Sequence, residues 1–164
     1  MPTSNPIDIL LEHDRWATQN VLDVCKTLSP EQFHQRFEMG PGSLHDTVMH
    51  IITAIRVWDD VLSRRDQRPR LEGTKRSIAE LQSLLDESTT AFTEVARKFP
   101  LDETVVRERE GQKRVFSRAG VITHVATHGV HHRAQCINML RQLGVTPLPN
   151  SSVADWMRSA DPKR

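Results

Sequence analysis

Four long segments of the sequence place apolar residues at every third or fourth position, and this helical spacing constrains the fold more than any other feature. The segments begin near Pro6, Ser43, Ser77 and Ser117, and the last one ends before Gly144. Ser43 and Ser77 each stand three residues before an acidic residue, a pattern typical of a helix start. No long alternating pattern predicts a strand, so the helices must bury their apolar faces against one another. We therefore expect an all-α chain folded as a four-helix bundle.

The segments between these helices are shorter and less regular. Ser29, Pro30 and Gln32 form a capping-box pattern that predicts one short extra helix. Residues 101–115 are polar and in places β-branched, and we expect either a loop or a small hairpin there. The chain of 164 residues has no internal repeat or low-complexity tract, so we expect a single helical domain over residues 1–164.

Charge and composition exclude several classes of protein. Lysine and arginine total 22 and aspartate and glutamate total 21, so the chain has no strong field to attract nucleic acid or an anionic membrane. The N-terminal sequence MPTSNPIDILLEH lacks the basic region and apolar core of a signal peptide, and no apolar run approaches the roughly 18 residues of a membrane span. We expect a soluble, cytoplasmic protein whose two cysteines, Cys25 and Cys136, are reduced.

The stretch HVATHGVHHRAQC, residues 124–136, holds four of the eight histidines of the chain. On the fourth predicted helix, His128 and His132 fall in the same sector as the apolar Val121 and Met139, so both are expected to point into the protein. Two imidazoles four residues apart on one helix can reach a single metal ion. The alternative is that each is a buried histidine hydrogen-bonded to a neighbour.

A pair of histidines needs a third ligand from another helix to hold a metal ion. His50 lies on the flank of the apolar arc of the second long helix, where a side chain would enter between neighbouring helices, and it is the first candidate. His13, at the edge of the first helix, is either a hydrogen-bond partner of a ligand or a surface residue. His45 is expected to be exposed in a capping turn, and His34 lies outside the four long helices.

The chain as a whole resembles the DinB/YfiT-like family of metal-dependent helical-bundle proteins. The matching motifs cover nearly all of the chain in the order of the family, and they are LLEHDRWATQNVLD, GSLHDTVMHIITAIRVW, HVATHGVHHRAQ and LRQLGVTPLPNS. The resemblance implies an up-down-down-up four-helix bundle, a homodimer, and one divalent metal ion bound by His50, His128 and His132. Neutral imidazoles suit several metals, and zinc or nickel is the expected ion.

Two positions depart from the family pattern. Many relatives have an acidic residue five positions after the second-helix histidine, where this chain has Ile55, and a glycine where it has Ala134. The acid of those relatives is a potential general base or outer carboxylate. Because this chain has isoleucine there, catalytic details are not transferable from relatives that have the acid.

A site with three histidine ligands leaves at least one position for water or substrate, as catalytic zinc sites do. The resemblance implies two kinds of chemistry on a small-molecule substrate: hydrolysis, and transfer or isomerisation with a low-molecular-weight thiol. No residue of the sequence distinguishes a hydrolase from a thiol transferase. His124, His131 and Gln135, on the edge of the fourth helix, either contact the substrate and orient the ligands or form a solvated face.

Three alternatives give other roles to these residues. A closed structural metal site would take Cys136 as its fourth ligand, but this residue is about 12 Å along the helix axis from His128. A nucleophilic Cys136 with His132 as its base conflicts with apolar neighbours that favour an inert, buried thiol. A metal-free interaction module is the third alternative. Arg133 projects away from the apolar stripe and is expected to be a surface or dimer contact.

Overall fold

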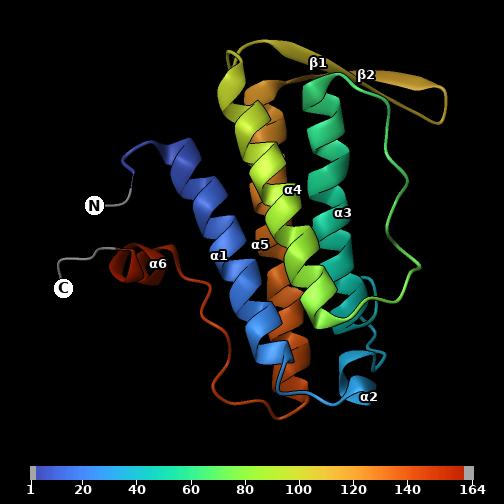
Figure 1. The fold of residues 1–164 in the computed structure, drawn as a ribbon, viewed down its shortest axis with the longest axis vertical. Helices are drawn as coiled ribbons and strands as arrows, with labels where there is room; N and C mark the ends of the chain where they lie inside the picture. Colours follow the sequence, from blue (N-terminus) through green and yellow to red (C-terminus); the bar gives the residue numbers. More distant parts are fainter. Residues whose placement is uncertain (1–2, 161–164) are drawn as a thin grey trace.

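The computed structural model describes residues 3–160, and Figure 1 shows a mostly helical chain with one small sheet. The long helices are α1 (Pro6–Cys25), α3 (Leu44–Ser63), α4 (Ile78–Lys98) and α5 (Arg118–Gln142). The shorter elements are α2 (Pro30–Phe33), β1 (Thr104–Arg109), β2 (Gln112–Ser117) and α6 (Val153–Ser159). The helical class is confirmed, although the sheet corrects the expectation of a purely α-helical chain. Within the described residues, no helix has the length and hydropathy of a membrane span.

Serine caps start the helices where the sequence pattern predicts. Ser29 and Ser77 form complete capping boxes at the starts of α2 and α4. Ser43 and Ser117 each accept a hydrogen bond from the backbone N–H three residues further on. These bonds satisfy N–H groups that the first turn of a helix leaves without a partner. Gly144 follows the end of α5 with a φ of 74°, a conformation that glycine adopts without steric cost.

The four long helices pack in pairs around an apolar core. Helix α3 contacts α4 and α5, and α1 contacts the same two helices. Each helix contributes fully buried side chains to the core, for example Val21, Ile52, Leu85 and Met139. Burying such a side chain stabilises the fold by roughly 1.5–3 kcal/mol. Because α5 packs against both α1 and α3, it buries residues on two of its sides, and the side toward α3 carries the histidines.

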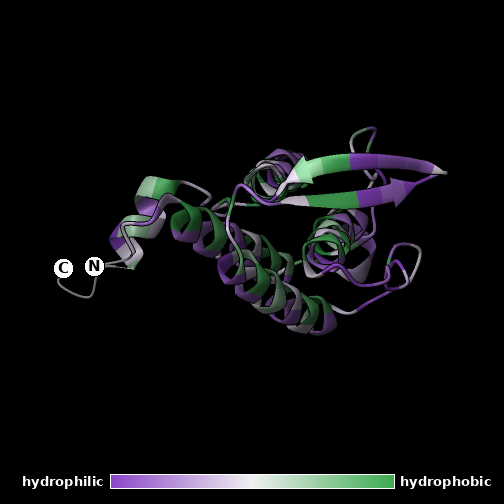
Figure 2. Ribbon diagram, turned by 90° about the horizontal axis from the view of Figure 1, so that it is seen from above, coloured by the Kyte–Doolittle hydropathy of each residue, from purple (hydrophilic) through white to green (hydrophobic). Residues whose placement is uncertain are grey.

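The strands β1 and β2 form an antiparallel hairpin at one end of the long helices (Figure 1). Glu110 and Gly111 form the turn with φ values of 55° and 74°, and this left-handed pair matches the twist of a two-residue hairpin. β1 contacts α3 and β2 contacts α5. Figure 2 shows that the strands are hydrophobic near the helices and hydrophilic toward the turn. Of the two structures expected after residue 101, the hairpin is the one that forms.

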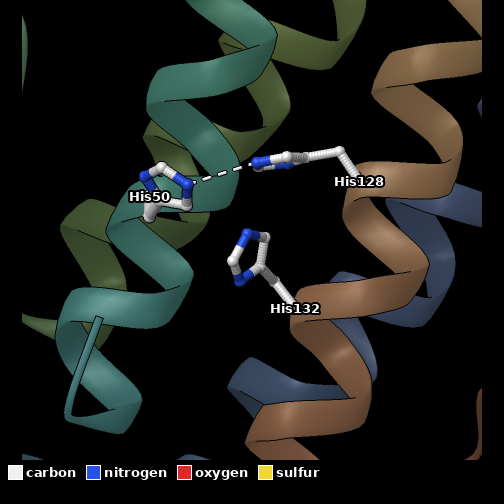
Figure 3. Close-up of side chains that lie close together, drawn as sticks. All are labelled: His50, His128 and His132. Atoms are coloured by element: carbon white, nitrogen blue, oxygen red, sulfur yellow. Dashed lines mark hydrogen bonds between the residues drawn. The ribbon is translucent and has the colours of Figure 1, made fainter. Parts of the chain in front are cut away.

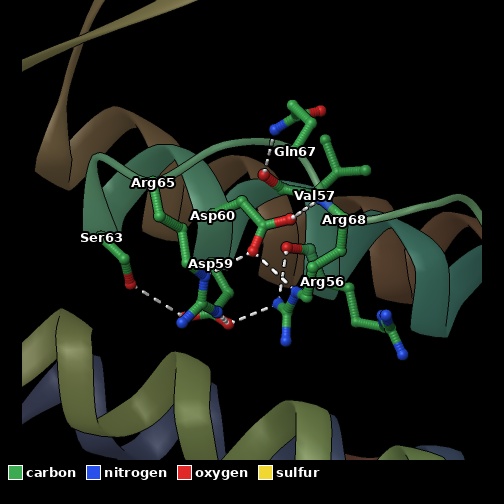
Figure 4. A network of polar contacts seen from close by, with 8 residues as sticks. All are labelled: Arg56, Val57, Asp59, Asp60, Ser63, Arg65, Gln67 and Arg68. Carbon is green, nitrogen blue, oxygen red and sulfur yellow. Dashed lines mark hydrogen bonds and ion pairs between the residues drawn. The ribbon is translucent and has the colours of Figure 1, made fainter.

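The segment between α3 and α4, residues 64–77, is tied to the end of α3 by a cluster of charges (Figure 4). Asp59 and Asp60 are almost fully buried, and both form ion pairs with Arg65 and Arg68. The backbone N–H of Arg68 also donates to Asp60 across 2.9 Å. Buried carboxylates need such partners, since an unpaired charge would be costly there. The cluster therefore fixes the start of residues 64–77, and the later part of this segment passes His50 of α3.

Candidate metal centre

His50 of α3 and His128 and His132 of α5 converge between the two helices (Figure 3). Each of the three places a ring nitrogen within 4.8 Å of the others. The Nε2 atoms of His50 and His128 are 3.2 Å apart, and the ring centroid of His132 lies 4.7 Å from that of His50 and 4.4 Å from that of His128. The spacing of four residues on α5 stacks two imidazoles on one helix face, and the packing of α3 against α5 brings in the third.

Burial favours the neutral form of the two imidazoles on α5. It lowers the pKa of His128 to about 3, and the neighbouring His132 and His50 add to the shift. Burial also lowers the pKa of His132, although a hydrogen bond to Gln135 opposes the change. A neutral imidazole keeps a nitrogen lone pair for a metal ion, whereas a protonated one has none. Both residues of α5 are therefore in the ligating form at neutral pH.

Gln135 fixes the tautomer of His132. Its Oε1 lies 2.8 Å from Nδ1 of His132, and its Nε2 lies 3.1 Å from Nε2 of His131. An amide oxygen only accepts, so Nδ1 of His132 carries the proton and Nε2 is left with the lone pair. The side chain of Gln135 packs against Gly40, where a Cβ would clash with the amide oxygen. Glycine at this position therefore allows the loop before α3 to close over Gln135.

Glu72 is a carboxylate beside His50 that the sequence analysis missed. Its Oε1 lies 3.5 Å from Nδ1 of His50. Burial opposes ionisation of Glu72, but two hydrogen bonds from Arg70, of 2.7 and 3.2 Å, contribute to lowering its pKa. The position where relatives carry an acid, Ile55, is buried in the core instead. The only sequence signal for Glu72 was a charged connecting segment, which is typical of solvent-exposed loops.

The donor set fits a divalent transition-metal ion. Among residues 3–160, His50, His128 and His132 are the one group of three or more His, Cys, Asp or Glu whose ligand atoms converge in this way. Neutral imidazole nitrogens suit zinc, nickel, iron and copper. The expectation that these three residues are positioned to hold a metal ion is confirmed by the geometry. The identity of the metal stays a prediction.

A pocket of about 500 Å³ adjoins the three histidines, and His50 and His128 form part of its wall. Trp58 of α3 and Phe116 of β2 supply an aromatic wall, with ring centroids 5.3 Å apart in an edge-to-face contact. The hairpin and the segment after α3 contribute four arginines, which are Arg70, Arg107, Arg109 and Arg114. A small molecule in this pocket would lie next to two of the three candidate ligands.

The remaining histidines proposed from the fourth helix, His124 and His131, are both exposed, but they lie on different sides of the cluster. His124 lines the pocket, and its ring centroid is 5.2 Å from that of Trp58 and 5.7 Å from that of His128. His131 does not line the pocket, and its ring centroid is 4.9 Å from that of His132. His124 is therefore placed to meet a bound molecule, while His131 reaches the cluster through Gln135.

Two other histidines differ from expectation. His45 is buried rather than exposed, because Nδ1 bonds to Asp46 and Nε2 accepts a hydrogen bond of 3.1 Å from the backbone N–H of Arg76. His13 is also buried, and its Nε2 lies 2.9 Å from the backbone oxygen of Ser151 in the segment before α6. Neither residue belongs to the candidate metal centre.

Arg133 was expected at the surface, and this prediction is wrong. The residue is 1% exposed and pairs with the buried carboxylate of Asp14 on α1. It also donates to the hydroxyl of Thr18 across 3.1 Å. Gly129 makes room for the pair, since a Cβ there would clash with Asp14. The helical wheel of α5 identified the side toward α3, whereas Arg133 faces the second neighbour, α1.

Cys136 has the environment of an inert thiol. It is fully buried, and burial raises its pKa well above the ordinary range. Its sulfur is not among the converging ligand atoms of the described residues. The geometry therefore favours neither a fourth thiolate ligand nor a nucleophilic cysteine.

The fold and the site together define a class: a mostly helical protein in which three histidines from two neighbouring helices converge beside a pocket. The sequence profile of the DinB family matches residues 1–161, and the chain belongs to this family, as its motifs indicated. Protein DinB of Bacillus subtilis (strain 168) is 26% identical over 152 residues, which cover 85% of this chain and 87% of that protein. The crystal structure of a DinB-like protein, YjoA, from Bacillus subtilis matches with a TM-score of 0.62 at 16% identity, covering 87% of this chain and 96% of that one. This structural likeness concerns the fold alone.

Proposed function

We propose that this DinB-family protein binds one divalent metal ion, zinc or nickel, through His50, His128 and His132, and acts as a metal-dependent enzyme on a small molecule. The observation that carries the proposal is the convergence of three ligand atoms within 4.8 Å beside a pocket of about 500 Å³. A metal ion bound there would acidify a water molecule for hydrolysis or bind a substrate thiolate for transfer. The reaction class is accordingly a hydrolase or a low-molecular-weight-thiol transferase.

The residues of the chain have separate roles in this proposal. Gln135 orients His132 and Glu72 lies beside His50, as outer partners of histidine ligands commonly do. Trp58 and Phe116 exclude water from one side of the pocket. His124 lines the same pocket near His128 and is placed to exchange a proton with a bound substrate.

We extend the proposal to the architecture that the family resemblance implies. In this proposal the four long helices form an up-down-down-up bundle as one domain, and the packing of α3 and α1 against both α4 and α5 supports it. The protein is proposed to act as a homodimer in the cytoplasm, with no nucleic acid partner. The near balance of 22 basic and 21 acidic residues supports the last point.

A substrate screen on the untagged, full-length protein tests the enzymatic proposal. The protein is loaded with zinc or nickel, or treated with a chelator, and offered a panel of thiol conjugates, small amides and esters. We expect turnover that requires the metal and is lost in His50→Ala, with an unchanged circular dichroism spectrum. Metal binding without turnover across the panel would favour the alternative of a metal-stabilised, non-catalytic bundle or interaction module.

A further inference from the structure

The hairpin turns Arg107, Arg109 and Arg114 toward the pocket, and the apolar pair Val106 and Val115 toward solvent. Arg107 lies directly opposite Arg114 in the register of the strands, and Val106 lies directly opposite Val115. Directly opposed residues share a face of a sheet, and both arginines line the pocket. Val106 and Val115 are 55% and 65% exposed. The face with the arginines also carries Val105, which is 2% exposed, and Phe116 opposite it, so it covers the helices with apolar residues at its base and presents arginines to the pocket further along.

Two of the four pocket arginines have no carboxylate partner among the residues that the structure describes. Arg70 pairs with Glu72 across 2.7 Å, and Arg109 pairs with Glu110 across 3.0 Å. Within residues 3–160, Arg107 forms no ion pair, and Arg114 bonds only to the neutral amide of Gln112. Like charges directly opposite each other on two strands are destabilising. The pair Arg107 and Arg114 therefore leaves uncompensated positive charge on the wall of the pocket.

An aromatic surface connects this charge to the three histidines. The guanidinium carbon of Arg107 lies 4.7 Å from the ring centroid of Trp58, which holds the group over the indole face. Trp58 in turn contacts Phe116 and His124, and His124 lies next to His128. The pocket thus offers an anion-binding end, an apolar wall and a histidine end in one cavity of about 500 Å³.

We propose that the pocket binds a small organic acid, with its carboxylate or phosphate between Arg107 and Arg114 and its apolar or aromatic body against Trp58 and Phe116. Arginine binds both kinds of anion through charge-assisted, often bidentate hydrogen bonds. The inference rests on the proposed function in one respect, because it names the substrate class of the same site. The anion itself is held by the hairpin, so its binding does not require the metal ion.

Isothermal titration calorimetry on the full-length protein tests this inference with benzoate, phenyl phosphate and benzamide, the last being an uncharged match of benzoate. Each probe is titrated into metal-loaded and chelator-treated protein. We expect benzoate and phenyl phosphate to bind in both forms, and the tighter of the two to identify the preferred anion. Benzamide should bind at least roughly tenfold more weakly than benzoate, as expected for the loss of charge-assisted hydrogen bonds.

Arg107→Met and Arg114→Met should each weaken benzoate binding by roughly tenfold or more, while Arg141→Met, an exposed position at the end of α5, should leave it unchanged. Arg114 is exposed, so its variant gives a test that does not depend on the packing of Arg107 over Trp58. Equal binding of benzamide, unaltered binding in both arginine variants, or no binding of either anion would overturn the inference. If the anions bind only to the metal-loaded protein and bind equally well to both arginine variants, the metal ion itself is the anion-binding group. This result would refute the inference and support the metal centre.

Discussion

Gln135 lies between His132 and His131, accepting a hydrogen bond from the first across 2.8 Å and donating to the second across 3.1 Å. In the proposed metal centre this contact holds the proton of His132 on Nδ1 and leaves Nε2 for the ion. Gln135→Leu should therefore weaken zinc affinity by roughly 10–100-fold while the fold is retained. Competition with a chromogenic chelator measures the affinity. Gln142→Leu, at an exposed site on the same helix, is the control, and equal affinities in the two variants would show that Gln135 has no such role.

Substitution with cobalt tests whether the site is open. With His50, His128 and His132 as the only protein ligands, an exogenous thiol should bind the ion and produce a thiolate-to-cobalt band in the visible or near-ultraviolet spectrum. The protein alone should lack this band, and Cys136→Ser should have the same spectrum as the wild type, because Cys136 is fully buried outside the cluster. A thiolate band in the unliganded protein that disappears in Cys136→Ser would instead indicate a closed structural site.

The ion pair between Asp14 and Arg133 should be important for stability, because both groups are buried between α1 and α5. Removing one partner leaves the other charge buried and unpaired, so Arg133→Met should lower the free energy of unfolding by about 3–5 kcal/mol in urea denaturation. The exposed pair of Arg15 and Asp86 is the matched control, and Asp86→Asn should cost less than about 1 kcal/mol. Similar losses in the two variants would contradict this view of the buried pair.

Because Cys25 and Cys136 are buried thiols, we expect the protein to lose stability at alkaline pH. Burial raises the pKa of Cys25 to about 12 and also raises the pKa of Cys136, whereas an unfolded thiol has a pKa of roughly 8.5. The folded state keeps protons that the unfolded state loses, so this contribution is fully present below about pH 8.5 and is lost as the pH rises toward the folded values. Between pH 7.5 and pH 10.5, the wild type should therefore lose more stability in urea denaturation than the Cys25→Ala, Cys136→Ala double variant. The same change with pH in both proteins would show that the thiols titrate normally.

Much of the fold and the core of the candidate site could be predicted from sequence because the signals are local. Ser43 and Ser77 start helices through bonds to residues three positions away, and the spacing of four residues places His128 and His132 on one face. The position of His50 on the flank of the apolar arc could likewise be predicted from the sequence of its own helix. The sequence also limited the structure after residue 101 to a loop or a hairpin.

The features that the sequence did not reveal depend on which elements pack together. Arg133 is buried because α5 has a second neighbour, and His45 is buried because the backbone before α4 returns to cover it. Glu72 reaches His50 only because the charged segment after α3 is anchored by buried carboxylates. Arg107 faces the pocket because of the register of the hairpin and its position on the helices. The residue pattern within one strand determines neither of these.

The metal content of His50→Ala, compared with the wild type and with His13→Ala, tests the central claim most directly. His13 is a suitable control because it is a buried histidine that bonds to Ser151, outside the candidate centre. Each untagged protein is saturated with zinc, dialysed, and measured by elemental analysis, with circular dichroism to verify the fold. We expect about one zinc ion per chain in the wild type and in His13→Ala, and almost none in His50→Ala, because a pair of ligands four residues apart on one helix does not complete a stable site. Stoichiometric zinc in His50→Ala would contradict the three-histidine centre.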